Sequence, residues 1–239
     1  MVKAPALSKR LTTVFEMTPY ARTAADIGCD HAHLAINLYV SGRAGNVFAS
    51  DIREGPIAAA KNNVLRCGCE DAVKTVLAPG LRGVINEDVD VYIISGMGGE
   101  TIVSILDEYK SRFSAKETFI LQPQSSIEDL REYLYKNGFN IEKERICEDA
   151  GHMYTVMRVS FDGKVREEDE VYLYIGRRAK EARDPLFGTL LRRRISEHER
   201  ILSGLTDAKY EERAKKISKL IADMKVVLEE YEDDCKRNI

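Results

Sequence analysis

The chain has 239 residues, of which 44% are hydrophobic and 31% are charged, and its formal net charge is −3. This length supports one well-packed core with a smaller appendage, and the slightly acidic balance excludes a protein that is basic over its whole surface. Five scattered cysteines, without a signal peptide or a long apolar span, predict a soluble, cytoplasmic and reduced protein with no membrane segment. The Cys67-Gly68-Cys69 pair has no further His or Cys pair nearby, so we expect no metal site.

The first two thirds of the chain alternate between helical and strand patterns. One helix is predicted over residues 5–18, and another begins at Gly55-Pro56. Apolar residues at helical spacing predict three more, through Leu34 to Val40, through Ile102 to Leu106 and from Ile127 to Tyr135. The predicted strands end at Ile27 and cover 47–51, 73–77, 89–94 and 118–121, and two alternating segments cover 139–146 and 152–161. Five strand–helix units followed by a β-hairpin predict a Rossmann-like α/β fold of the class I methyltransferase type, mostly parallel with an antiparallel hairpin at its edge.

The turn after the first strand reads Asp26-Ile27-Gly28-Cys29-Asp30-His31. Gly28 permits a positive φ and lets a ligand approach the backbone. A dinucleotide fingerprint would have glycine where this chain has Asp30, and an acid at the mouth of the next helix repels phosphate. It suits a cationic or amino-bearing ligand, and S-adenosylmethionine (SAM) carries both a sulfonium and an ammonium. An ordinary strand–helix turn is the alternative for this motif alone.

Asp51 ends the second predicted strand, where a carboxylate in a βαβ unit accepts hydrogen bonds from the two ribose hydroxyls. Together, the turn and this acid predict a cofactor that contains a nucleoside. The residues expected to contact it belong to the ends of neighbouring strands: Asp26, Gly28, Cys29, Asp30, His31, Asp51, Ile52, Ala78, Gly80, Ser95 and Gly96.

The segment Ser95-Gly96-Met97-Gly98-Gly99 follows the fourth predicted strand and is expected to be a turn. The first and fourth strands flank the point where strand order reverses, and ligands collect there in doubly wound sheets. The glycines would leave bare backbone groups facing the crevice. No Gly-Lys-Ser/Thr follows, which excludes a phosphate-binding P-loop.

From Lys164 the sequence becomes charged and helical, which predicts a catalytic domain over residues 1–163 and a helical domain over 164–239. One helix is predicted over 168–183, and Asp184-Pro185 is the predicted start of the next. Two apolar heptad stripes joined by a turn at 204–207 predict an antiparallel coiled-coil hairpin.

The appendage is locally basic, because eight basic residues lie between Arg177 and Arg200 against four acids. Phosphate contacts require such a patch, and a solvated helix face with local ion pairs is the alternative. The residues predicted to contact RNA are Arg177, Arg178, Arg183, Arg192 and Arg193, together with Lys9 and Arg10 in the first helix.

Five motifs spread along the chain read DIGCDH, ASDI with EGP behind it, ISGMGG, LQP and EDAGHMY. Together they resemble the bacterial tRNA adenosine-22 N1-methyltransferases over essentially the whole chain. The resemblance implies SAM-dependent methyl transfer to N1 of a tRNA adenine, with Gly28, Asp30 and Asp51 at cofactor positions. It also implies that the segment from Ser95 to Met97 faces the target base. Pro79 stands where the family usually has an Asp that accepts from the adenine of SAM, which predicts weaker cofactor binding.

Adenine N1 has an in-plane lone pair and can attack the methyl group directly, so catalysis consists of positioning and no covalent nucleophile is needed. The positive charge that forms on adenine favours nearby acceptors, for which we expect the backbone of Ser95, Gly96 and Met97 and the amide oxygen of Gln122. His31 would orient either substrate, and a hydrogen bond to backbone is its alternative role. Because N1 lies on the Watson–Crick edge, the base must be unpaired or extruded, with an aromatic side chain or Met97 stacked on it.

Two other functions stay open at this stage. The first is SAM-dependent transfer to another RNA or to a small molecule. The second is a catalytically decayed RNA-binding protein, which the Pro79 departure permits. We expect a monomer that uses SAM as its cofactor and tRNA as its partner.

Overall fold

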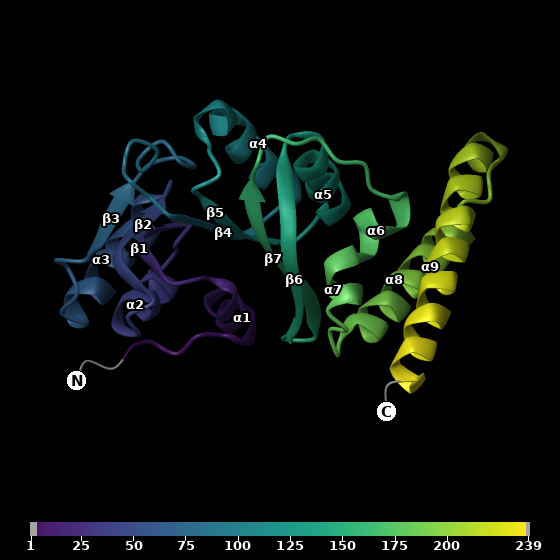
Figure 1. The fold of residues 1–239 in the computed structure, drawn as a ribbon, viewed down its shortest axis with the longest axis horizontal. Helices are drawn as coiled ribbons and strands as arrows, with labels where there is room; N and C mark the ends of the chain where they lie inside the picture. Colours follow the sequence, from purple (N-terminus) through teal and green to yellow (C-terminus); the bar gives the residue numbers. More distant parts are fainter. Residues whose placement is uncertain (1–3, 238–239) are drawn as a thin grey trace. The chain divides into compact units, whose positions relative to one another are not determined.

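The computed structural model describes residues 4–237, and the chain divides into two compact units, residues 1–167 and 168–239. The first unit alternates strands and helices, whereas the second is helical (Figure 1). Because strands and helices alternate only in the first unit, a ligand site of the Rossmann type can form only there.

A seven-stranded sheet runs through the first unit. Its strands are β1 (Ala21–Ile27), β2 (Ala44–Asp51), β3 (Val73–Leu77), β4 (Val91–Met97), β5 (Thr118–Pro123), β6 (Phe139–Asp149) and β7 (His152–Phe161). Their order is β3-β2-β1-β4-β5-β7-β6, with β1 to β5 parallel and β7 antiparallel to both β5 and β6. The predicted fold class is therefore confirmed, and strand order reverses between β1 and β4.

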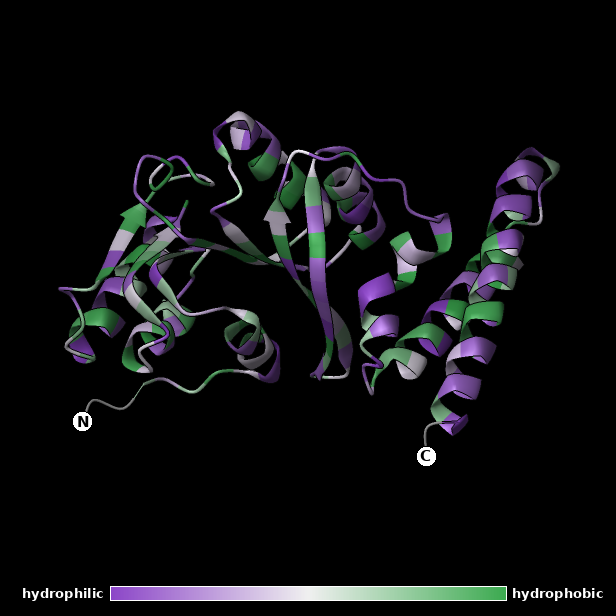
Figure 2. Ribbon diagram, in the orientation of Figure 1, coloured by the Kyte–Doolittle hydropathy of each residue, from purple (hydrophilic) through white to green (hydrophobic). Residues whose placement is uncertain are grey.

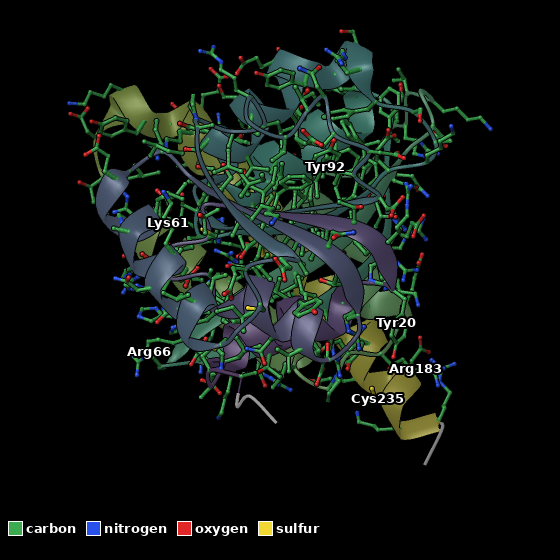
Figure 3. The ribbon with its side chains drawn as sticks, turned by 90° about the vertical axis from the view of Figure 1, so that its left-hand side faces the viewer. Tyr20, Lys61, Arg66, Tyr92, Arg183 and Cys235 are labelled. Carbon is green, nitrogen blue, oxygen red and sulfur yellow. The ribbon has the colours of Figure 1, made fainter. Side chains whose placement is uncertain are left out.

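Helices cover both faces of the sheet. α1 (Lys9–Met17), α2 (His33–Val40) and α3 (Glu54–Arg66) lie on one face, and α4 (Gly99–Tyr109) and α5 (Ile127–Lys136) lie on the other (Figure 1). A 3-10 helix, η1 (Lys110–Arg112), follows α4. Ser8 caps α1 because its side-chain oxygen accepts from the Leu11 backbone N–H at 3.3 Å. Lys61 and Arg66 on α3 point outward from the unit (Figure 3).

The two faces of the sheet have different cores, because side chains alternate along each strand. On one face, Ile93 and Ile120 pack with aliphatic residues of α1 and α2. On the other, aromatic rings contact one another: Phe113 lies 4.8 Å from Phe119, and Tyr92 lies 5.6 Å from Phe119, centroid to centroid. Tyr92 lies within the unit (Figure 3). Helices and packed side chains thus occupy both faces of the sheet, and the strand ends are left for a cleft.

The fourth strand is longer than predicted. β4 continues through Ser95 to Met97, which were expected to form a turn, because Ser95 still pairs with Gln122 of β5 and Met97 pairs with Pro123. The register shifts between Ser95 and Met97, so Gly96 forms a β-bulge with φ +79°. The expected turn is therefore the irregular end of a strand.

The second unit contains α6 (Glu170–Ile175), α7 (Arg177–Glu181), α8 (Phe187–Ser203), the 3-10 helix η2 (Ala208–Tyr210) and α9 (Glu211–Arg237). The single helix predicted over 168–183 is wrong, because Gly176 adopts φ +84° and separates α6 from α7. Asp184 also does not start α8 directly. Its carboxylate accepts from the Leu186 backbone N–H at 2.9 Å, and the helix begins at Phe187.

α8 and α9 run side by side as a helical hairpin (Figure 1). α9 alternates hydrophilic and hydrophobic bands along its length (Figure 2). Its buried residues include the predicted Ile221, Met224 and Tyr231, and also Leu220 and Val227, so the apolar stripe is wider than the two predicted heptad positions. No helix within residues 4–237 is both long and apolar enough to cross a membrane.

Candidate functional site

Two adjoining clefts open at the carboxyl ends of the parallel strands in the first unit. The larger has a volume of about 420 Å³ and the smaller about 100 Å³. The larger is lined by Ile27, Gly28, Asp51, Ile52, Arg53, Ala78, Pro79, Gly80, Ser95, Gly96, Met97, Thr101, Ser104, Ile105 and Glu108. The smaller is lined by Arg10, Leu11, Asp26, Gly28, Cys29, Asp30, His31, His33, Leu34 and Ser95. Gly28 and Ser95 belong to both, so the clefts meet between β1 and β4.

All residues predicted to contact a cofactor line one of these clefts. Residues 26–31 and 51–52 reach them from two neighbouring strands, because β1 and β2 pair in register up to Ile27 and Ser50. The backbone N–H groups of Gly28 and Cys29 donate to the Ser50 carbonyl at 2.8 and 2.9 Å. The parallel pairing thus brings together residues about twenty positions apart in sequence.

The turn at Gly28 is tightly packed and uses left-handed backbone conformations. Gly28 has φ +76°, and a Cβ there would lie 2.4 Å from the Met97 methyl carbon. Asp30 and Ala32 also have positive φ, 49° and 58°, although neither is glycine. A strained loop of this kind is typical of a ligand-binding site.

Asp51 is the buried anchor of the larger cleft. It is 5% exposed, and its two carboxylate oxygens accept from the backbone N–H groups of Arg53 at 3.0 Å and Asp30 at 3.3 Å. The Arg53 Nε also donates to one of these oxygens, at 3.5 Å. A carboxylate has about four acceptor positions, so at least one remains for a ligand hydroxyl. A buried acceptor at this strand end fits a ribose hydroxyl.

Asp30 lies beside Asp51, with its own carboxylate 3.9 Å from the Arg53 guanidinium and 3.5 Å from the His31 ring. The expected position of Asp30 at the start of the helix is wrong, because Ala32 occupies the N-cap position and no side chain caps α2. His31 lines the smaller cleft and its ring centroid lies 5.7 Å from that of His33. The acidic turn is therefore present, but Asp30 lies two residues before the N-cap residue Ala32.

Asp26 is 3% exposed in the smaller cleft. The pKa of its carboxyl is raised to about 7, chiefly by burial and also by the negative charge of Asp51, against the lowering effects of a backbone hydrogen bond from Ala35 and the positive charge of Arg10. Burial also raises the pKa of the neighbouring Cys29 thiol far above its usual range. Cys29 therefore remains a neutral thiol and is no nucleophile.

Gln122 has a different role from the predicted one. Its side chain is fully buried and lines neither cleft, its amide oxygen accepts from Arg10 Nη1 at 2.7 Å and Gly96 N at 3.1 Å, and its amide nitrogen donates to the Pro123 carbonyl at 2.8 Å. Both acceptor positions of the oxygen are used, so the expected contact between Gln122 and the target base is wrong. Gln122 holds the β4 bulge and Arg10 in place instead.

Arg10, which the sequence predicts to contact RNA, lines the smaller cleft. α1 brings it there, and the Asp149 carboxylate accepts from its backbone N–H at 3.1 Å. Its neighbour Lys9 is exposed and lies outside both clefts. The sequence carries no local signal for this placement of Arg10, because its partners lie more than one hundred residues away.

Gly98 and Gly99 do not line either cleft, contrary to the expectation for the glycine-rich segment. They allow a close approach of backbones, because a Cβ on Gly99 would lie 2.1 Å from the Ser126 carbonyl oxygen. The Gly99 N–H also donates to the Ser125 carbonyl at 2.8 Å. These glycines thus join the start of α4 to the loop before α5.

One wall of the larger cleft was not predicted. It comes from α4, whose residues Thr101, Ser104, Ile105 and Glu108 share a helix face because they are spaced three and four apart. That spacing directly after a glycine-rich segment is the signal by which they could have been found. Ile105 approaches the loop at Gly80, since a Cβ on that glycine would lie 3.4 Å from it.

Three of the five arginines of the second unit that are predicted to contact RNA form ion pairs within residues 4–237. Arg177 pairs with Glu168 at 2.6 Å and Asp169 at 2.9 Å, and its guanidinium carbon lies 3.8 Å from the centre of the Tyr172 ring. Other pairs join Arg178 to Glu181 and, across the hairpin, Arg192 to Glu232. Arg183 has φ +51° before α8 and Arg193 lies exposed on it. Most of the excess positive charge is therefore locally balanced.

Within residues 4–237, no group of three or more His, Cys, Asp or Glu side chains is arranged to hold a metal ion. Two adjoining clefts, a buried acid at the end of β2 and a β7 strand inserted antiparallel between β5 and β6 define a Rossmann-like methyltransferase.

Comparison with known proteins gives the family. A family profile described as tRNA (adenine(22)-N(1))-methyltransferase matches residues 24–226 of the chain. The chain belongs to this family, as its motifs predicted. The tRNA (adenine(22)-N(1))-methyltransferase of Bacillus subtilis (strain 168) is 36% identical over 151 residues, which span 63% of this chain and 63% of that relative.

Solved structures resemble both units. The B. subtilis m1A22 tRNA methyltransferase TrmK has a TM-score of 0.79 at 28% identity, covering 97% of this chain and 99% of that one. M. capricolum TrmK, in complex with S-adenosyl-homocysteine, has a TM-score of 0.80 at 25% identity, covering 93% and 98%. A Streptococcus pneumoniae protein in complex with S-adenosyl-L-methionine has a TM-score of 0.83 at 29% identity, covering 93% and 100%.

Proposed function

We propose that the protein transfers a methyl group from SAM to N1 of adenine 22 in tRNA. The observation that carries this proposal is the convergence of Asp51, Asp30 and the Gly96 bulge on two joined clefts, in a chain of this family. The B. subtilis and M. capricolum relatives bear the corresponding names, and the latter was solved with the product of SAM.

The two clefts suit the two halves of SAM. The adenosine half would occupy the larger cleft, with its ribose on Asp51 and its base between Ile52 and the Ala78 to Gly80 loop. The methionine half would occupy the smaller cleft, where Asp26 and Asp30 suit the ammonium and Arg10 suits the carboxylate. Gly28 and Ser95, which the clefts share, would then flank the sulfonium.

Pro79 stands where the family usually has an acid, but the larger cleft contains another acid, Glu108. Glu108 lines the same cleft from α4, where its carboxylate also lies 3.6 Å from Arg82. We propose that Glu108 accepts from the amino group of the SAM adenine in place of the family's usual Asp. This favours a working cofactor site over a decayed one.

Bound SAM supplies an electrophilic methyl group, and the protein positions the acceptor. Gln122 holds the Gly96 N–H, which sets the shape of the bulge that faces the target base. The backbone carbonyls of this bulge stabilise the positive charge that develops on adenine. Asp26 and Cys29 lie beneath the turn and exclude water from the smaller cleft, since both are almost fully buried.

We propose that Arg178, Arg183, Arg192 and Arg193 of the helical unit, together with Lys9, contact tRNA phosphates. The ion pairs of Arg178 and Arg192 are partly exposed, with side-chain exposures of 38% and 58% for the two arginines. Such pairs contribute little stability, so a phosphate can replace the carboxylate at small cost.

The proposal is tested by incubating the protein with unmodified tRNA and isotopically labelled SAM, followed by mass spectrometry of the nucleosides. We expect labelled 1-methyladenosine, and a reverse-transcription stop at position 22, because the methyl group blocks the Watson–Crick edge. A transcript with cytosine at position 22 is the matched control and should remain unlabelled. Label in another RNA or in a metabolite fraction alone would contradict the proposed acceptor.

Calorimetry with SAM separates an active enzyme from a decayed RNA-binding protein. We expect saturable SAM binding at one site per chain. Intact tRNA binding with no measurable SAM binding would favour the decayed protein and overturn the proposal.

A further inference from the structure

The β6–β7 hairpin extends past the carboxyl edge of the sheet. β7 pairs with β5 only from Ser160 to Met157, opposite Thr118 to Leu121. In this antiparallel register, residues 152–156 continue alongside the end of β5 and beyond it, still paired with β6. The hairpin therefore stands over the edge of the sheet where the clefts open.

α1 attaches to this projecting part of the hairpin. The Asp149 carboxylate, near the hairpin turn, accepts from the Arg10 backbone N–H at 3.1 Å. Arg145 of β6 pairs with Glu16 of α1 at 2.5 Å. The hairpin is thus held against the helix that carries Arg10 into the smaller cleft.

The Arg10 side chain links one tyrosine of the hairpin to the bulge of β4. Its guanidinium carbon lies 5.9 Å from the centre of the Tyr154 ring, and its Nη1 donates to Gln122. The same nitrogen would lie 3.3 Å from a Cβ on Gly96. The Tyr154 ring, the Arg10 guanidinium and Gly96 therefore follow one another along the rim of the site.

The fold itself makes little use of Tyr154. The side chain is half-buried, and its hydroxyl has no hydrogen-bond partner among residues 4–237. The ring contacts the Arg10 guanidinium and lies 6.3 Å from the His152 ring, centroid to centroid. A flat ring beside the bulge, paired with a guanidinium, is suited to stack on a ligand.

We infer that Tyr154 is the residue on which the target adenine stacks, with the Arg10 guanidinium alongside it. The inference rests on the proposed function and names its base-holding residue. Extruded bases are commonly held on an aromatic ring or a guanidinium plane, while their edge is read by hydrogen bonds. Here the ring comes from the hairpin, and the edge faces the Ser95 to Met97 backbone.

The test compares tRNA and SAM kinetics in Tyr154→Ile and Tyr154→Phe. Isoleucine suits a strand but has no π face, so we expect KM for tRNA to rise on the order of tenfold or more with little change in SAM affinity. Phenylalanine keeps the ring and loses only the unpartnered hydroxyl, so it should stay within about twofold of wild type. Tyr20→Ile, at an exposed position just before β1 (Figure 3), is the matched control and should leave both KM values unchanged.

A measurement without a variant guards against misfolding of Tyr154→Ile. In wild-type protein, tRNA with 2-aminopurine at position 22 should show quenched fluorescence on binding, as expected for a stacked base. A bright, unstacked base, or an unchanged KM for tRNA in a folded Tyr154→Ile variant, would overturn the inference. Absence of 1-methyladenosine with wild-type protein would instead overturn the proposed function.

Discussion

Asp51 and Arg192 show how differently the two units use charge. Asp51 is 5% exposed, receives two backbone N–H groups and keeps acceptor positions toward a cleft. The Arg192 side chain is 58% exposed and is paired with Glu232 from the facing helix. The first charge is held in place before any ligand arrives, whereas the second is balanced within its own surface.

This difference follows from the backbone architecture. Parallel strands end at one edge of a sheet, so acids at strand ends must converge. On a helical hairpin, the register between the helices decides which charges meet, and here acids of α9 meet bases of α7 and α8, as in the Lys180–Glu230 pair at 2.6 Å. A motif at a strand end therefore predicts a site more securely than a count of basic residues on a helix.

The largest effect should come from the packed backbone that supports the clefts. Gly99→Ala places a Cβ 2.1 Å from the Ser126 carbonyl oxygen, and we expect it to lower the free energy of unfolding by about 3 kcal/mol, measured by urea denaturation. The control is Gly204→Ala between α8 and η2, where the nearest atom would be 3.5 Å away. Equal decreases in the free energy of unfolding for Gly99→Ala and Gly204→Ala would contradict the expected difference in packing at the two positions.

Asp51→Ala should have the next largest effect. It removes the acceptor expected to bind the ribose, and hydrogen bonds to a charged group are worth about 1.5–3 kcal/mol, so SAM affinity should fall roughly a hundredfold. Asp223→Ala on α9 removes an exposed acid paired with Lys219 and should leave SAM affinity unchanged, as measured by calorimetry. Unaltered binding in Asp51→Ala would show that the ribose lies elsewhere.

The pKa of Asp26 predicts a pH dependence for SAM binding. At a pKa of about 7, the carboxyl is largely protonated at pH 6 and ionised at pH 8, and a cationic ligand favours the ionised form. As the pH is increased toward 7, SAM affinity should therefore rise by at most about tenfold per pH unit. Above pH 7 the affinity should level off. Asp26→Asn should give a flat profile between pH 6 and 8.

The same group gives a check on unfolding without ligand. The pKa of Asp26 is raised above its unfolded value of 3.8, so the native state binds more protons than the unfolded state between about pH 4 and 7. Its contribution to the free energy of unfolding therefore declines as pH rises through that window. Asp26→Asn removes the decline, and a slope that persists unchanged in this variant would assign it to another group.

The smallest effect is expected across the hairpin. A double-mutant cycle on Arg192 and Glu232 should give a coupling energy of about 0.2–1 kcal/mol that decreases in high salt, because both groups are exposed. A coupling energy above about 2 kcal/mol would contradict this expectation, because it would indicate a pair held rigidly and shielded from water, as Asp51 is.

The sequence predicted the sheet and most of the cleft because both depend on local signals. Gly28 and Asp51 stand at strand ends, and their spacing places them side by side in any parallel βαβ unit. It could not show that Gln122 and Arg10 bind each other, because their hydrogen bond joins residues 112 positions apart. The residues on the cleft-facing side of α4 were also not predicted. Their spacing indicates that they share one helix face, but no sequence signal indicates that this face lines a cleft.

The amino-acid sequence itself determined the order of strands and helices along the chain, the acidic turn and the family. Each of these depends on patterns that extend over only a few residues: hydrophobic periodicity, a glycine at a turn and an acid at a strand end. Only the tertiary structure decided that Ser95 to Met97 form a bulge, that Gly176 divides a helix, and that Arg10 lines a cleft with the Tyr154 ring beside its guanidinium. The physical reason is that backbone pairing and helix packing bring distant residues together, and a side chain's charge or ring acquires its role from those neighbours.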